Sequence, residues 1–127
     1  MTHIIYIVAR LTLVMLLCNG LNAIAGESDV RIFRLTITDG KVPAAERTLK
    51  VIKGDPVRII VTSNGPGALH LHGYRLEARL APGTPAELEF RAHATGRYPL
   101  EWHGSDNARQ NSAHHGPPMA ALEVHPK

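Results

Sequence analysis

Histidine is the residue type in this chain best suited to chemistry, and it is unevenly distributed. Six of the eight histidines lie between residues 70 and 115, whereas the only cysteine, Cys18, lies near the N-terminus. Neutral imidazole is the commonest metal ligand near pH 7, and a thioether beside it points to copper more than to zinc. We therefore predict a copper site without a thiolate, with zinc or an empty site as alternatives. The candidate ligands are His70, His72, His103, His114, His115 and Met119.

The spacing of these residues suits strands, in which side chains at positions i and i+2 project from one face. His70 and His72 would then approach a common point, and Glu101 would share a face with His103. Simpler interpretations also fit the pattern. The paired histidines could be ordinary solvated surface, Glu101 could pair with an arginine, and Met119 could be core packing at the start of a strand.

Residues 1–25 have the pattern of a secretory signal peptide: one positive charge at Arg10, an apolar run, and a small-x-small end at 23–25. We expect cleavage after Ala25, which leaves a domain of residues 26–127 in the periplasm or secreted. A membrane anchor is the rival interpretation, but polar residues interrupt the apolar stretch, which is short for a span of about 20 residues. The mature chain is therefore expected to have no membrane span.

Composition sets further limits on the mature chain. It would have 102 residues, with 13 lysines and arginines against 11 acidic residues, hence a net charge of +2. So small a charge, with the two signs interspersed, argues against nucleic acid as a partner. This length suffices for one domain with a single core. Because no cysteine remains after cleavage, no disulfide would stabilise it, and packing alone must do so.

The elements that must position the histidines read as short strands separated by turn residues. We predict eight of them, at 30–38, 47–53, 57–63, 69–74, 76–80, 86–92, 97–103 and 119–125. The first alternates imperfectly, which a bulge near Phe33 would explain. Short strands with turns every eight to twelve residues predict an all-β fold, a sandwich or a barrel with Greek-key connections, and we favour the Greek-key β-sandwich. The long irregular stretch 104–118 is of a length that is usually either functional or disordered.

The order of these motifs resembles the cupredoxin family, as seen in small blue-copper proteins and in the copper-binding domain of cytochrome oxidase subunit II. The resemblance covers roughly residues 30–126. It is carried by Lys53-Gly54-Asp55-Pro56 before an apolar strand, His70, Ala81-Pro82-Gly83, Thr95-Gly96-Arg97-Tyr98-Pro99, His115, Met119 and Leu122-Glu123-Val124.

The resemblance implies a ligand set, with one departure. His70 matches the family's first histidine ligand, His115 or its neighbour His114 the second, and Met119 the axial methionine. The family's cysteine ligand should follow the Tyr-Pro-Leu-Glu run, where this chain has Trp102. A blue site is therefore not expected.

The chain is also similar to cupredoxin-like domains that carry His-Gly-Tyr followed by a Glu-x-His pair. This second similarity implies His72 and His103 as ligands.

Two functions of different class follow. The first is an exported copper-binding protein with a histidine-rich, thiolate-free site that holds or delivers copper, with electron transfer as a further option. Its partners would be a metal ion and a periplasmic redox or copper-transport protein, and its copper binding would weaken below about pH 6, because imidazoles must be deprotonated to bind. The alternative is a metal-free cupredoxin-like interaction domain that docks on a partner protein. We do not expect an enzyme, since no nucleophile at a known spacing accompanies Glu101 and His103.

Overall fold

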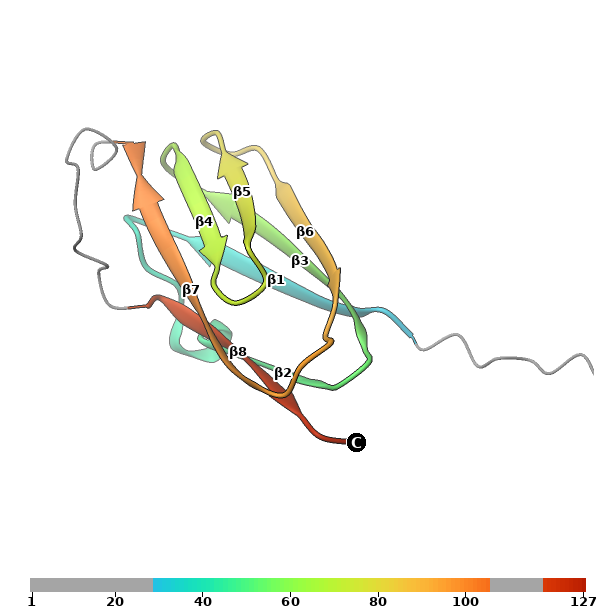
Figure 1. The fold of residues 1–127 in the computed structure, drawn as a ribbon. Coiled ribbons are helices and arrows are strands. Elements are labelled where there is room, and N and C mark those ends of the chain that lie inside the picture. Colours follow the sequence, from blue (N-terminus) through green and yellow to red (C-terminus); the bar gives the residue numbers. More distant parts are fainter. Residues whose placement is uncertain (1–28, 106–117) are drawn as a thin grey trace, which may run out of the picture.

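The structure is a computed structural model, which describes residues 29–105 and 118–127. Within these residues the chain forms eight strands and one short 3-10 helix (Figure 1). They are β1 (Arg31–Ile37), η1 (Ala44–Glu46), β2 (Thr48–Ile52), β3 (Pro56–Ser63), β4 (Gly67–Leu71), β5 (Leu76–Leu80), β6 (Ala86–Arg91), β7 (Gly96–Gly104) and β8 (Ala120–His125). The predicted signal peptide, residues 1–25, lies outside the described residues.

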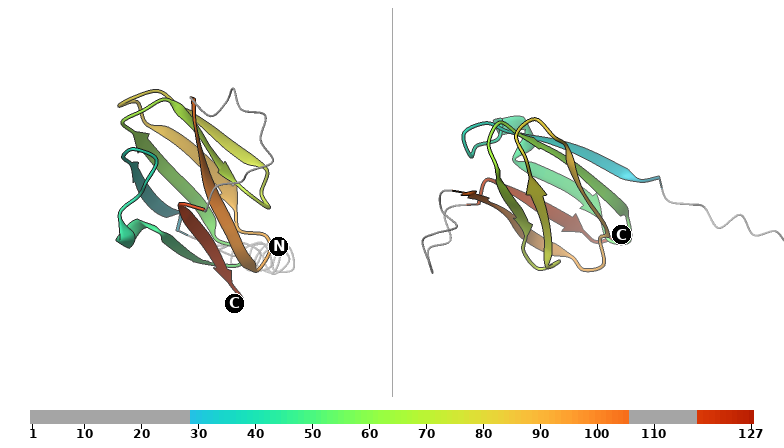
Figure 2. Two further views of the ribbon diagram at one scale, coloured as in Figure 1. Left: turned by 90° about the vertical axis from the view of Figure 1, so that its left-hand side faces the viewer. Right: turned by 90° about the horizontal axis from the view of Figure 1, so that it is seen from above.

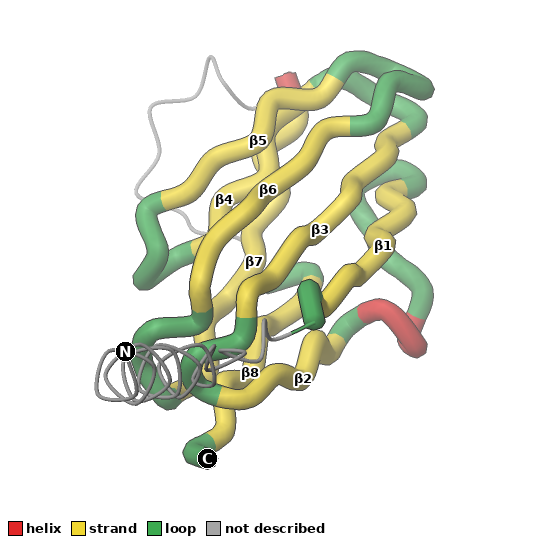
Figure 3. Tube along the Cα trace, turned by 90° about the vertical axis from the view of Figure 1, so that its right-hand side faces the viewer, coloured by secondary structure: helices red, strands yellow, loops and turns green. Residues whose placement is uncertain are grey.

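The described strands form two sheets that pack face to face. A three-stranded sheet has the order β1-β3-β6, and a five-stranded sheet has the order β2-β8-β7-β4-β5. Pairing is parallel between β1 and β3 and between β2 and β8, and antiparallel elsewhere. Figure 3 shows β6, β3 and β1 in front of β4 and β7, and Figure 2 shows the two layers from other sides. The predicted all-β sandwich of eight strands is confirmed.

The core lies between the sheets and follows from strict alternation along the strands. In β3, Val57, Ile59 and Val61 are at most 2% exposed, and Leu69 and Leu100 are fully buried on the opposing sheet. Burying side chains of this size contributes about 1.5–3 kcal/mol each relative to exposure. In the part of the chain that the structure describes, no helix has the length and hydropathy of a membrane span.

Two of the predicted strand details are wrong. No bulge occurs near Phe33, because β1 pairs with β3 residue for residue throughout its length. The alternation is imperfect for another reason: Ile32 is apolar but 54% exposed. The predicted strand 69–74 ends at Leu71, because Gly73 adopts a φ of +80° and turns the chain toward β5.

A close approach between glycine and tryptophan fixes β4 against β7. Gly67 pairs with Gly104, and the Trp102 ring lies directly over the Gly67 Cα, so that a Cβ there would be 2.4 Å from Trp102 Cζ2. Real carbon atoms pack at about 3.5–4.0 Å. Trp102 also packs against the buried core. This contact sets where the outer-face side chains of the two strands meet.

Candidate functional site

The outer face of the five-stranded sheet carries the histidines of β4 and β7. His70 is paired in register with Glu101, and His103 with Ala68. His72 lies just beyond β4, but its backbone N–H still donates a hydrogen bond of 3.0 Å to the carbonyl of Pro99. The residues between them along both strands are apolar and point into the core. The predicted placement of Glu101 and His103 on one face is thus confirmed, and that face also carries His70.

Glu101 lies at the centre of this group. Its carboxylate Oε2 is 3.0 Å from His72 Nε2 and 3.9 Å from His103 Nε2, and its side chain is only 12% exposed. A buried carboxylate is tolerated where it is paired, because burial removes the hydration of its charge. Two imidazoles therefore converge on one negatively charged oxygen.

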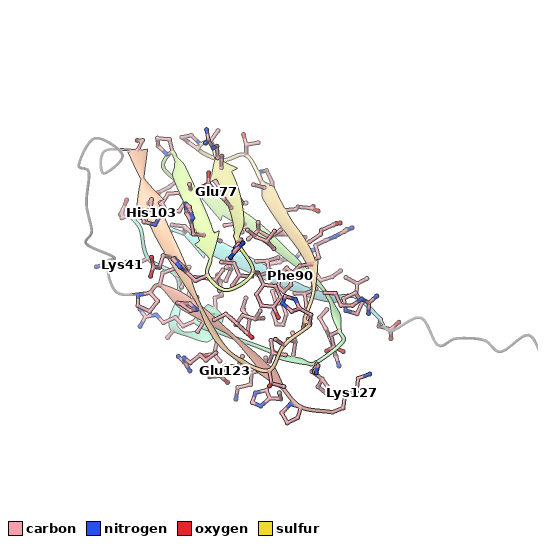
Figure 4. All side chains as sticks on the ribbon, in the orientation of Figure 1. Lys41, Glu77, Phe90, His103, Glu123 and Lys127 are labelled. Atoms are coloured by element: carbon pink, nitrogen blue, oxygen red, sulfur yellow. The ribbon has the colours of Figure 1, made fainter. Side chains whose placement is uncertain are left out.

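His70 completes the group from the β5 side. Its Nε2 is 3.0 Å from Glu77 Oε2, on the strand that pairs with β4, and its ring centroid is 4.8 Å from that of His103. The rings of His70 and His72 are 6.3 Å apart. Figure 4 labels His103 and Glu77, which lie in the same half of the molecule, away from Glu123 and Lys127.

We call the five residues His70, His72, Glu77, Glu101 and His103 the histidine cluster.

A tight turn positions His72. Gly73 follows it with a φ of +80°, and a Cβ at Gly73 would lie 2.4 Å from Tyr98 Cδ1. Tyr98 is itself held by donating its hydroxyl to the carbonyls of Ala94 and Thr95, at 3.1 and 3.2 Å. A side chain at position 73 would therefore displace either the tyrosine or the backbone that carries His72.

Tyr74, the next residue, packs against the rings of Phe90, His93 and Tyr98, with centroids 4.6–4.9 Å away. Burial in this aromatic group raises the pKa of the Tyr74 hydroxyl, and the neighbouring Tyr98 adds to the shift. The aromatic group thus supports the turn from inside.

The predicted ligands fall into three groups. His70, His72 and His103 are brought together. Met119 precedes β8, where its backbone N–H donates to the Leu100 carbonyl at 3.0 Å, next to Glu101 in the chain, and its partly buried side chain packs against the core. His114 and His115 lie outside the described residues.

The two remaining histidines of the described region are exposed: His93 packs against the Tyr74 ring, and His125 Nε2 lies 3.6 Å from Glu123 Oε2.

Sequence reasoning missed the two carboxylates. The alternation of Glu101 and His103 placed them on one face, and the structure also brings the Glu101 carboxylate to His72. Glu77 gives no signal in the sequence, because its position beside His70 depends on the register of the β4–β5 hairpin.

The cluster offers imidazole nitrogen and carboxylate oxygen as donors. Among the described residues, no three histidine or acidic side chains are arranged so that they would already hold a metal ion. Instead, Nε2 of His70 and of His72 each lies 3.0 Å from a carboxylate oxygen. That separation is close to the distance of about 3 Å between neighbouring donors around an ion with bonds of about 2.0–2.1 Å. The donor set therefore suits a divalent transition metal.

No protein-family model and no curated protein matches the chain. Solved structures do match. A heme-copper terminal oxidase is similar with a TM-score of 0.55 and 14% identity, over 98% of this chain and 95% of that one. A copper binding protein in its apo form has a TM-score of 0.55 and 16% identity, over 76% of this chain and 88% of that one. The blue copper oxidase of Nitrosomonas europaea has a TM-score of 0.55 and 22% identity, over 78% of this chain and 40% of that one.

The fold is a cupredoxin-like β-sandwich. At these identities the similarity establishes the architecture, and function must be argued from the site. In this cupredoxin-like sandwich the histidine cluster occupies the outer face of β4 and β7, while the inner faces of the same strands build the core.

Proposed function

We propose that the histidine cluster binds copper(II), and that the protein holds or delivers copper outside the cytoplasm. The observation that carries the proposal is the convergence of the His72 and His103 imidazoles on the buried carboxylate of Glu101, with His70 against the His103 ring. The copper proteins among the structural neighbours support the choice of metal, and divalent copper has the highest intrinsic affinity for such donors in the first transition series.

Each residue would contribute something different to binding. The imidazoles of His70, His72 and His103 would supply neutral nitrogen donors, once their Nε2 atoms exchange the present carboxylate contacts for the metal. Glu101 would supply negative charge beneath the ion and fix the ring orientations, as carboxylates commonly do for metal-bound histidines. A bound copper ion would act here as cargo. Met119 and the pair His114 and His115 remain candidate additional ligands.

The exposure of the rings favours exchange of copper over electron transfer. The side chains of His70 and His72 are 37% exposed and that of His103 is 42% exposed. An ion held on such a surface is open to incoming ligands from a partner. The chain's only cysteine, Cys18, lies in the predicted leader. We therefore expect a pale copper(II) protein with a type 2 spectrum, without the intense absorption of a copper–thiolate bond.

Copper titration against a competing chelator tests the proposal. The double variant His70→Ala, His103→Ala should lose most of the affinity for copper(II), because it leaves one imidazole in the cluster. The control is His125→Ala, which removes an exposed histidine outside the cluster and should bind copper as the wild type does. Electron paramagnetic resonance should show nitrogen coupling in the wild type and the control.

Equal copper affinity in the His70→Ala, His103→Ala variant and in the His125→Ala control would refute the assignment of the site to the cluster. Uptake by the wild type should also decline below about pH 6, since protons compete with the metal for imidazole.

A further inference from the structure

Asn64 and Asp39 form a clip between two turns at one end of the sandwich. Because β1 and β3 are parallel, both strands end there, and Asp39 comes shortly after the first as Asn64 comes directly after the second. Asn64 Nδ2 donates a hydrogen bond of 2.9 Å to Asp39 Oδ1, and Asn64 Oδ1 accepts one of 3.0 Å from the backbone N–H of Asp39. Both ends of the Asn64 amide are therefore tied to residue 39.

Asn64 is also chemically labile, because Gly65 follows it. Outside the predicted leader it is the only asparagine followed by glycine. In such a pair the glycine backbone nitrogen can attack the side-chain carbonyl carbon, since no Cβ hinders its approach. Hydroxide takes the proton from this nitrogen, a bond forms between the nitrogen and Cγ, and ammonia leaves from Cγ. Water then opens the resulting cyclic imide to give aspartate or isoaspartate.

The surroundings of this pair give the reaction room, whereas the hydrogen bonds oppose it. Asn64 is exposed, and no heavy atom lies within 4 Å of a Cβ at Gly65, so water reaches both reacting groups. Ring closure requires Asn64 Cγ to turn toward the Gly65 nitrogen, but the two hydrogen bonds hold the amide on Asp39. The Gly65 N–H also donates to Ser63 Oγ at 3.2 Å, which disfavours loss of its proton.

We propose that Asn64 is a deamidation site that Asp39 guards in the folded protein, so that conversion depends on opening of this end of the sandwich. Two hydrogen bonds, one of them to a carboxylate, are enough to slow ring closure by about ten-fold. Conversion would also prevent the clip from forming again. An aspartate at position 64 lacks the Nδ2 donor and adds a second negative charge beside the Asp39 carboxylate.

Isoaspartate would have a further effect, because it lengthens the backbone between β3 and Gly67. The close contact of Gly67 with Trp102 holds β4 against β7. The clip therefore protects the position of the strand that carries His70.

Peptide mass spectrometry, with chromatographic separation of aspartate from isoaspartate, measures the conversion. The purified protein is incubated at mildly alkaline pH, folded in buffer and, in parallel, unfolded in urea. The unfolded chain should convert Asn64 readily, and the folded chain about ten-fold more slowly. Gly65→Ala should suppress the conversion in both samples, because its Cβ hinders the attacking nitrogen, while the fold has room for it. This control ties the reaction to the cyclic imide.

Two variants of Asp39 test the guard itself. Asp39→Gly removes the carboxylate and suits the φ of +51° at this position, so the folded variant should convert Asn64 several-fold faster than wild type. Asp39→Asn keeps an oxygen acceptor at the same place and should stay close to the wild-type rate. Its new asparagine lies in a different tryptic peptide from Asn64, because Lys41 and Arg58 separate them. Melting curves recorded alongside should show both variants folded during the incubation.

Equal rates in folded and unfolded wild-type protein, or a rate in Asp39→Gly no higher than in wild type, would overturn the guard. An unfolded chain that leaves Asn64 intact would overturn the site itself. Asn64→Asp reproduces one product and should melt below the wild type, since two carboxylates would face each other. An equal melting temperature would refute the predicted loss of the clip.

Discussion

Replacing Gly67 by alanine tests how β4 is held against β7, and hence how the histidine cluster is assembled. A Cβ at this position would lie 2.4 Å from Trp102 Cζ2, 2.6 Å from Trp102 Cη2 and 2.6 Å from the carbonyl oxygen of His103. Carbon atoms pack at about 3.5–4.0 Å, so the indole must move by roughly 1 Å. The backbone carbonyl can yield only if the paired strands separate.

Overpacking of this kind costs about 1–3 kcal/mol. For a domain of about 100 residues each kcal/mol lowers the melting temperature by about 4–8 °C, so Gly67→Ala should melt roughly 5–20 °C below the wild type. Thermal unfolding followed by circular dichroism measures this directly. Trp102 is the only tryptophan in the chain, so its fluorescence should report the displacement of the ring in the folded state.

Gly65→Ala is the matched control two residues earlier. No heavy atom lies within 4 Å of a Cβ at Gly65, and its φ is not positive. Alanine there should leave the melting temperature unchanged or raise it slightly. It lowers the conformational entropy of the unfolded chain, which stabilises the folded state by about 0.4–1 kcal/mol. If Gly67→Ala and Gly65→Ala share the same melting temperature and the same emission spectrum, the packing account of the β4–β7 pair is wrong.

Three further predictions concern the support of the site. Tyr98→Phe removes the hydroxyl that donates to Ala94 and Thr95 and should lower the free energy of unfolding by about 0.5–1.5 kcal/mol in a urea titration; an unchanged midpoint would contradict it. Leu69→Ala leaves a hole under the cluster and should cost about 2–5 kcal/mol in the same assay, whereas a loss below 1 kcal/mol would mean that the sheets close around it. The raised pKa of Tyr74 favours its protonated form in the folded state. Its contribution to the free energy of unfolding should therefore be fully present below the unfolded pKa of about 10 and be lost as pH rises through the pKa of the folded state. Tyr74→Phe should make this alkaline decline shallower, and an identical pH profile would count against the shift.

Much of the sandwich could be predicted from the sequence because apolar and polar residues alternate along most of its strands. The apolar and β-branched residues of β3 predict a central strand, and the structure places β3 between β1 and β6. The assignment of β1 and β2 to different sheets could not be predicted, since it depends on which partners they find across the core. The bulge predicted in β1 was wrong because Ile32 is exposed, and a hydropathy pattern does not show which apolar residue remains in contact with water.

The candidate site was predictable within single strands and unpredictable between them. Period-two alternation places His70 beside His72 and Glu101 beside His103 with no further information. That Glu101 meets His72, and that His70 meets Glu77, depends on how β4 pairs with β7 and with β5, which the turn at Gly73 and the packing of Trp102 on Gly67 help to set. Arginine at a left-handed turn position gives no local signal of that turn, so the hairpin register could not be derived.

In β4 and β7, alternate residues serve different purposes. Those on the inner face, such as leucine, build the core, and the histidine and glutamate on the outer face form the candidate site. A substitution of a donor residue on the outer face leaves the core residues of the inner face unchanged. The scaffold can therefore acquire, lose or swap individual donors one residue at a time without being rebuilt, which makes this β-ribbon a convenient host for engineering metal preference.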